Sequence, residues 1–77
     1  MPNRDRIVAI LENVSKKSPA PPPDESLFDS GYLDSFALPD MIAELEREFH
    51  ITVPDSDLHP RKFESISRIE SYLESRV

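Results

Sequence analysis

A cluster of prolines constrains the fold of this chain more than any other feature. Residues 19–23 read Pro-Ala-Pro-Pro-Pro. Proline has no backbone N–H and its ring clashes with the preceding helical turn, so no helix can pass through this stretch. We interpret the cluster as a short, stiff polyproline-II spacer. A ligand for an SH3-type domain is the less favoured alternative.

Helical spacing of apolar residues occurs on both sides of this cluster. A stripe at i, i+3, i+4 and i+7 predicts an amphipathic helix over residues 3–16, and a similar stripe predicts another over residues 35–49. Pro39 would lie near the start of the second helix, where a missing donor costs less than in mid-helix. The stripes consist of Ile7, Ile10, Leu11 and Val14, and of Leu38, Ile42, Leu45 and Phe49 with Met41 beside them.

The C-terminal third predicts one short helix and one longer helix. Residues 55–59 are expected to form a short helix or 3-10 turn that turns Leu58 inward and ends at Pro60. A last helix follows, with Ser65 or Glu64 as its cap. Its buried face is expected to consist of Ile66, Ile69, Tyr72 and Leu73, with Phe63 packed over the start.

These elements predict an all-α fold, because no segment shows the alternation of a strand. The expected architecture is a small antiparallel bundle of three main helices plus one short helix. The chain, residues 1–77, amounts to a single small domain. A domain of ~60 residues buries only about 60% of its unfolded surface, so a deep, walled active site is not expected.

The segment between the first two helices, about residues 17–34, is long and carries its own apolar anchors. Connections in compact domains usually run about 4–6 residues. Gly31, the only glycine, is expected to supply a turn with positive φ. The segment would therefore be folded, and it would deliver Asp34 and Ser35 to a defined place. Its expected anchors are Leu27, Phe28 and Leu33.

The negative charge of the chain is concentrated in its middle. The net charge is −6, and residues 24–50 alone hold eight acids against one base, Arg47, a balance of −7. An acidic field of this kind steers basic partners to its surface. It argues against nucleic acid as a partner, because nucleic acid requires a basic face.

Several other classes of site and location are excluded or disfavoured. The chain has no cysteine, which excludes disulfides and thiolate metal sites. The acids lack EF-hand spacing and neither histidine has a partner at ligand spacing, so no metal site is expected. No apolar run approaches the ~20 residues of a membrane span, and the first residues do not form a secretory signal, so a cytoplasmic location is expected.

The residue types of a hydrolase triad are present, but their surroundings do not support catalysis. The chain has no G-x-S-x-G elbow, and a single glycine provides no glycine-rich stretch for an oxyanion hole. The sequence therefore predicts that the protein is not an enzyme. The residues considered for a triad are Ser35, Asp34, His50 and His59.

Ser35 itself has two interpretations. The serine either caps the helix that follows, as serines at such positions commonly do, or it accepts a phosphodiester-linked group. The second is favoured electrostatically, because the partial positive charge and free N–H groups of a helix start attract phosphate. Asp34 would help to place the Mg²⁺ of a modifying enzyme, and the apolar residues after Ser35 would give that enzyme a surface to bind.

The outward face of the same helix suggests a contact surface. Phe36 is either exposed among charged neighbours, which is typical of a binding surface, or folded back onto the preceding loop. The residues that share this face are Phe36, Asp40, Ala43 and Arg47, with Glu44 beside them.

Residues 27–36, Leu-Phe-Asp-Ser-Gly-Tyr-Leu-Asp-Ser-Phe, resemble the phosphopantetheine attachment region of acyl carrier proteins. In that family, the serine of an Asp-Ser-Leu type motif carries 4′-phosphopantetheine. The motif here is Asp34-Ser35-Phe36, so the resemblance implies that Ser35 is the attachment point and that Asp34 belongs to the cofactor-binding site. The similarity covers nearly the whole chain and continues through residues 44–49, 51–54 and 63–66.

The resemblance implies a non-catalytic carrier with an acyl-carrier-like fold. The arm, derived from coenzyme A, would hold an acyl or aminoacyl group as a thioester on its terminal thiol. The implied partners are a phosphopantetheinyl transferase, an acyl- or aminoacyl-activating ligase and downstream acyl-transfer or modifying enzymes, all acting on a monomer. The implied docking face consists of Asp34, Phe36, Asp40, Ala43, Glu44 and Arg47.

Three positions separate the chain from the carriers of fatty-acid synthesis. Those carriers usually have leucine, an acid and another acid where this chain has Phe36, Ala37 and Arg47. With its Ile-x-Val-Pro connector at residues 51–54, the chain is more similar to D-alanyl and other aminoacyl carrier proteins. A specialised stand-alone carrier is therefore favoured, and an unmodified acidic helical interaction module is the alternative.

Overall fold

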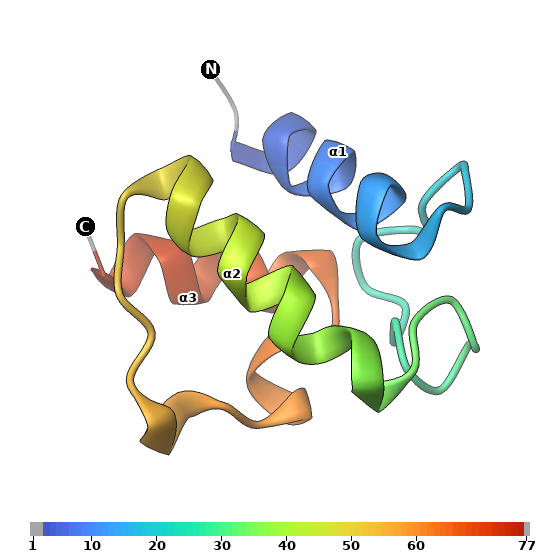
Figure 1. Cartoon of the computed structure of the whole chain (residues 1–77). Coiled ribbons are helices and arrows are strands. Elements are labelled where there is room, and N and C mark those ends of the chain that lie inside the picture. The colour runs from blue at the N-terminus through green and yellow to red at the C-terminus, as the bar shows by residue number, and fades with distance from the viewer. Residues whose placement is uncertain (1–2, 77) are drawn as a thin grey trace.

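Three α-helices form the body of the molecule. The computed structural model describes residues 3–76 and contains no β-strand within them, which confirms the predicted all-α fold. In Figure 1, α1 runs in the opposite sense to α2 and α3, which share one direction because a long connection joins them. The antiparallel arrangement therefore holds for the pairs that α1 forms. The helices are α1 (Asn3–Ser15), α2 (Leu38–Phe49) and α3 (Ile66–Arg76).

A short 3-10 helix, η1 (Ser35–Ala37), precedes α2, so the predicted α-helix over residues 35–49 begins later than expected. Pro39 explains the difference. In a continuous α-helix its N–H would donate to the Ser35 carbonyl, but proline has no N–H. That carbonyl instead accepts from the N–H of Leu38, which is the i to i+3 pattern of a 3-10 helix.

Two further 3-10 helices, η2 (Asp55–Asp57) and η3 (Pro60–Phe63), replace the single short helix expected before α3. The prediction that Leu58 turns inward is wrong, because this side chain is 40% exposed. Phe63, the last residue of η3, is fully buried, and its ring centroid lies 4.9 Å from that of Tyr72 on α3. Pro60 begins η3 and does not end a helix, since proline is tolerated in a first turn.

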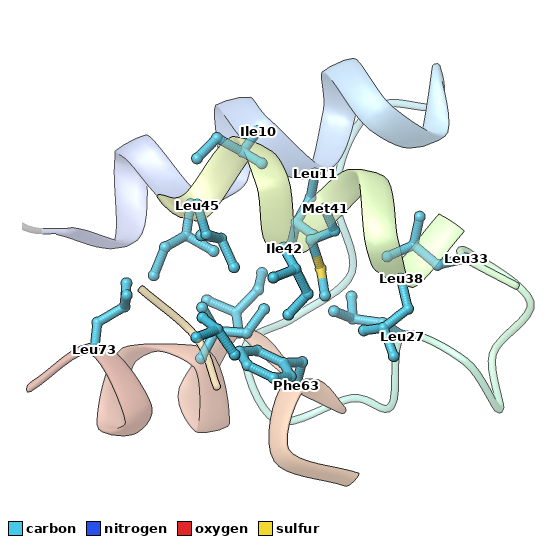
Figure 2. Close-up of a cluster of buried hydrophobic side chains, with 14 of the residues drawn as sticks. Ile10, Leu11, Leu27, Leu33, Leu38, Met41, Ile42, Leu45, Phe63 and Leu73 are labelled. Carbon is cyan, nitrogen blue, oxygen red and sulfur yellow. The ribbon is translucent and has the colours of Figure 1, made fainter. Parts of the chain in front are cut away.

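The core contains side chains from all three α-helices and from both long connections (Figure 2). The predicted stripe of α2 is buried as expected, except that Phe49 is only half-buried. The loop anchors Leu27 and Leu33 are buried, and Phe28 packs against the core from a half-buried position. The largest fully buried side chains are Phe63, Ile7, Leu11, Leu27, Met41, Leu45, Ile66, Ile69 and Leu73.

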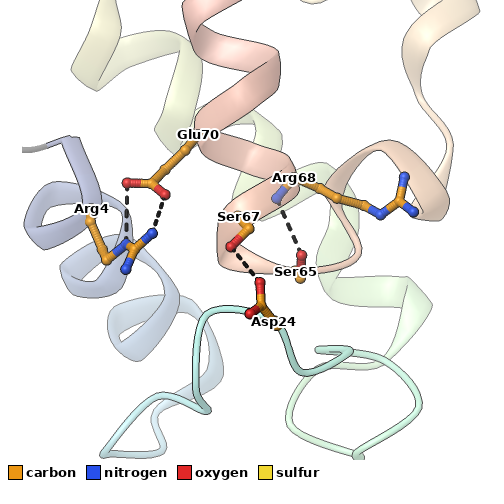
Figure 3. A network of polar contacts seen from close by, with 6 residues as sticks. All are labelled: Arg4, Asp24, Ser65, Ser67, Arg68 and Glu70. Atoms are coloured by element: carbon orange, nitrogen blue, oxygen red, sulfur yellow. Dashed lines mark hydrogen bonds and ion pairs between the residues drawn. The ribbon is translucent and has the colours of Figure 1, made fainter.

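Polar contacts fasten the proline-rich segment and α1 to α3 (Figure 3). The Asp24 carboxylate accepts a hydrogen bond from the Ser67 hydroxyl at 2.9 Å, and the carbonyl before it, of Pro23, accepts from the Ser67 N–H at 3.0 Å. Arg4 donates twice to Glu70, at 2.6 and 3.2 Å, across α1 and α3. The end of the proline cluster therefore lies against the start of α3.

Of the two residues predicted to cap α3, Ser65 takes this role: its hydroxyl accepts from the N–H of Arg68 at 3.2 Å (Figure 3). Tyr72, on the same helix, is half-buried and donates from its hydroxyl to Asp57 at 2.7 Å. Burial, and then this hydrogen bond, raise the pKa of Tyr72 above its ordinary value. Because the hydrogen bond joins α3 to η2, the long connection is held in a fixed position.

Replacing Leu45 by alanine should lower the free energy of unfolding by about 2–5 kcal/mol, because the side chain is fully buried and its removal leaves a cavity. Leu58→Ala is the matched control and should cost clearly less, since Leu58 is largely outside the core. Urea unfolding followed by circular dichroism measures both. Equal losses in the two variants would contradict the burial assigned to them.

Candidate functional site

Ser35 is exposed at the first residue of η1. Its hydroxyl makes no hydrogen bond within residues 3–76, although it stands at a helix start. The capping side chain is that of Asp34, whose Oδ1 accepts from the N–H of Ala37 at 3.1 Å. The interpretation of Ser35 as the cap is therefore wrong. Asp34 has an extended backbone, and its carboxylate reaches the Ala37 N–H, which also donates to the Asp34 carbonyl at 3.1 Å.

The position of Ser35 is set by two backbone hydrogen bonds that meet at Leu27. The Leu27 N–H donates to the carbonyl of Glu64 at 2.6 Å, and the Leu33 N–H donates to the carbonyl of Leu27 at 2.8 Å. Both leucine side chains are buried. The segment that precedes Ser35 is thus attached to the region just before α3, as the apolar anchors predicted.

Gly31 has φ of 82°, which confirms the predicted positive-φ turn. Its N–H donates to the carbonyl of Phe28 at 3.1 Å and closes the turn. A side chain in this backbone conformation would be strained, because L-residues rarely adopt it. The only glycine of the chain therefore lies where the backbone must reverse before Asp34.

Sequence reasoning missed a contact between this turn and the end of α1. The hydroxyl of Tyr32 donates to the carbonyl of Lys17 at 2.7 Å, and the Lys17 ammonium donates to the carbonyl of Gly31 at 3.1 Å. The Tyr32 side chain is buried. An aromatic residue between two apolar anchors was the available signal, but the spacing did not indicate its partner.

The chain contains three Asp-Ser pairs, and they differ in how free the serine is. Ser30 donates to the carbonyl of Leu27 at 3.4 Å, so its hydroxyl has a partner. Ser35 and Ser56 are both exposed. Only Ser35 among these three follows a capping aspartate at the start of a helix that continues into an α-helix. Ser56 lies inside the isolated turn η2.

The predicted docking face is assembled on η1 and the outer side of α2. Phe36 is 88% exposed, which decides between the two interpretations of this residue: it does not fold back onto the loop. Arg47 donates to Glu44 at 2.8 Å, so the one base of the acidic segment is paired on this surface. The other members of the face, Asp34, Asp40 and Ala43, are exposed.

Neither histidine considered for catalysis makes a hydrogen bond to Ser35 within residues 3–76. His50 follows α2 as its C-cap, with φ of 55°, and His59 precedes η3; both are exposed. Within the described part of the chain, no group of three or more potential ligands could hold a metal ion. No helix between residues 3 and 76 has the length and apolar character that crossing a membrane requires.

Comparison with known proteins gives consistent matches over most of the chain. The family described as "Phosphopantetheine attachment site" matches residues 5–73. The D-alanyl carrier protein of Streptococcus suis is 35% identical over 68 residues, which cover 88% of this chain and 86% of that protein. The D-alanyl carrier protein of Lactobacillus acidophilus is 28% identical over 75 residues, covering 97% and 95%. That of Streptococcus mutans is 37% identical over 54 residues, covering 70% and 68%.

The cap assignment predicts different effects for two adjacent substitutions. Asp34→Ala should lower the free energy of unfolding by about 1 kcal/mol, because it removes the capping carboxylate. Ser35→Ala should change it by less than about 0.5 kcal/mol, since the hydroxyl makes no bond to lose. Denaturant unfolding distinguishes them. A larger loss for Ser35→Ala than for Asp34→Ala would mean that the serine is the cap.

Proposed function

Because this chain belongs to the family of carrier proteins that bear a phosphopantetheine attachment site, we propose that Ser35 is the residue that carries the group. The family assignment makes the protein a non-catalytic carrier, and its cofactor is covalently attached 4′-phosphopantetheine. When bound, this arm supplies a terminal thiol that holds a cargo as a thioester. The chain has no cysteine, so it contributes no thiol of its own.

The surroundings of Ser35 support its assignment as the attachment residue. Its oxygen is exposed and carries no intramolecular hydrogen bond within residues 3–76, so it is available to a modifying enzyme. In the reaction, the Ser35 oxygen forms a bond to phosphorus and loses its proton, while the pyrophosphate bond of coenzyme A breaks and 3′,5′-ADP leaves. Asp34, the residue before Ser35, holds the backbone of η1 in place through its hydrogen bond from the Ala37 N–H.

We propose that partner enzymes dock on the face formed by Asp34, Phe36, Asp40, Ala43, Glu44 and Arg47. The exposed ring of Phe36 offers an apolar contact directly beside the attachment residue. The surrounding carboxylates attract lysine and arginine side chains, which gives rapid and salt-sensitive encounters. Glu44 pairs with Arg47, whereas Asp34 and Asp40 have no ion pair among the described residues. Weak binding suits a carrier that must visit several enzymes.

The cargo that we propose is an aminoacyl group, with D-alanyl as the first candidate. The curated relatives named above are D-alanyl carrier proteins, and the alignments cover most of this chain. The partners would then be a phosphopantetheinyl transferase, an aminoacyl-activating ligase and a downstream acyl-transfer enzyme. We propose that residues 1–77 act as a single stand-alone domain, as a monomer and in the cytoplasm, where such enzymes obtain coenzyme A and ATP.

An unmodified acidic interaction module is the alternative function. It would use the same face of α2 and the same field of carboxylates, but it would leave the Ser35 hydroxyl free. The unbonded hydroxyl beside a capping aspartate favours the carrier, because an unmodified module gains nothing from a serine in this position.

Incubation of the purified protein with coenzyme A and a broad-specificity phosphopantetheinyl transferase should add one phosphopantetheinyl group, seen by intact mass. Ser35→Ala should gain none. Ser56→Ala is the matched control, because Ser56 is also an exposed serine after an aspartate, and this variant should gain one group. A wild type that gains nothing, or a Ser35→Ala variant that still gains a group, would rule out the proposed attachment residue.

Docking through carboxylates should make loading sensitive to salt. Raising the ionic strength from about 0.05 to about 0.3 M should raise the KM of the transferase for the wild-type carrier several-fold, because screening shortens the range of charge attraction. The double variant Asp40→Asn, Glu44→Gln should show a higher KM at low salt and a weaker salt effect. Glu74→Gln on α3 is the control and should behave as the wild type. If KM depends on ionic strength in the same way for all three proteins, α2 does not belong to the docking face.

A further inference from the structure

Two hydrogen bonds of opposite direction join the end of α1 to the turn before Ser35. The Tyr32 hydroxyl donates to the Lys17 carbonyl at 2.7 Å, and the Lys17 ammonium donates to the Gly31 carbonyl at 3.1 Å. Each segment is therefore donor in one bond and acceptor in the other. We call this pair of bonds the Tyr32–Lys17 clamp. Because the ring of Tyr32 is buried in the core, its hydroxyl has little freedom to leave its partner.

The end of α1 is built so that Lys17 keeps a fixed position. The helix ends at Ser15, and Lys16 adopts φ of 60° while its N–H donates to the carbonyl of Glu12 at 2.8 Å. The N–H of Lys17 donates to the hydroxyl of Ser15 at 3.1 Å. Beyond it, the N–H of Ala20 donates to the Glu12 carboxylate at 3.1 Å. Contacts on both sides of Lys17 thus fix the backbone that the Tyr32 hydroxyl meets.

The clamp and the core hold the segment of Ser35 from two sides. Tyr32 is three residues before Ser35, and Leu33, between them, is buried and bonded to the carbonyl of Leu27 at 2.8 Å. The Leu33 contact restrains the segment toward the core. The clamp restrains the same segment toward α1. Without the clamp, the turn at Gly31 would keep its own hydrogen bond to the Phe28 carbonyl but lose these two bonds to Lys17.

We propose that Tyr32 and Lys17 are positioning residues that keep the Ser35 segment ordered before a modifying enzyme binds; this inference rests on the proposed function. A segment that is already ordered does not have to lose conformational freedom on binding, whereas a loosened segment does. The cost of ordering weakens binding of the ground state and of the transition state alike. Such a uniform loss raises KM and leaves kcat unchanged.

The two tyrosines of the chain provide a matched test. The hydroxyls of Tyr32 and Tyr72 each donate one hydrogen bond of 2.7 Å, but Tyr72 bonds to Asp57 in the connection before α3. Tyr32→Phe should raise the KM of a phosphopantetheinyl transferase for the apo carrier about two- to tenfold, because the net free energy of one hydrogen bond corresponds to a change of this size. The kcat should stay unchanged. Amide exchange over residues 31–37 should accelerate by a similar factor. Tyr72→Phe should leave both quantities within about twofold of the wild type.

The lysines test the second bond of the clamp. Lys17→Met removes the ammonium that donates to Gly31, and Lys16→Met is the control with the same change of charge one residue earlier. Lys17→Met should raise KM, whereas Lys16→Met should not. If the two bonds act as one clamp, the double variant Tyr32→Phe, Lys17→Met should raise KM by less than the product of the single effects.

Loading of the wild type and the KM of the variants distinguish a failure of the clamp proposal from a failure of the proposed function. A wild type that gains no phosphopantetheinyl group overturns the proposed function and, with it, the role of the clamp in loading. A wild type that is loaded normally, with the same KM for Tyr32→Phe and Tyr72→Phe, overturns the clamp alone. A fall in kcat without a rise in KM also overturns it, since positioning before binding would then not be the effect.

Discussion

The double anchorage of Leu27 is the interaction on which the rest of the site depends. Its N–H donates to the carbonyl of Glu64, its carbonyl accepts from Leu33, and its side chain is fully buried. One residue in the middle of a long connection therefore joins the region before α3 to the segment that carries Ser35. Since this connection has no regular helix between residues 16 and 34, these contacts take the place of a helical scaffold.

With Ser35 as the proposed attachment residue, the residue that stabilises the backbone is separate from the residue that carries the group. Asp34 caps η1, so the hydroxyl of Ser35 is not needed for folding and remains exposed. A serine that capped the helix would lose a stabilising contact whenever it was modified, at a cost of about 1 kcal/mol. The division of roles allows the carrier to be modified without this loss. The exposed ring of Phe36 follows Ser35 directly, and together with the acids of α2 it forms the face that we propose partner enzymes contact.

Much of this arrangement could be predicted from the sequence, because apolar periodicity and turn chemistry are local signals. They predicted the three α-helices, the positive φ of Gly31 and a cap of α3 at Ser65 or Glu64. They failed at Leu58, which was expected to turn inward but is 40% exposed, whereas Phe63 is buried as expected. The contact of Tyr32 with α1 was also missed, since no spacing rule relates a hydroxyl to a carbonyl fifteen residues earlier.

The most direct measurement of the central claim is peptide mapping by tandem mass spectrometry on the protein isolated from the cells that make it. The account predicts a phosphopantetheinyl group on the peptide that contains Ser35, with an aminoacyl group on its thiol in part of the population. Fragment ions should place the group on Ser35 and on no other serine. A protein with Ser35 unmodified under all growth conditions, or with the group on Ser30 or Ser56, would contradict the account.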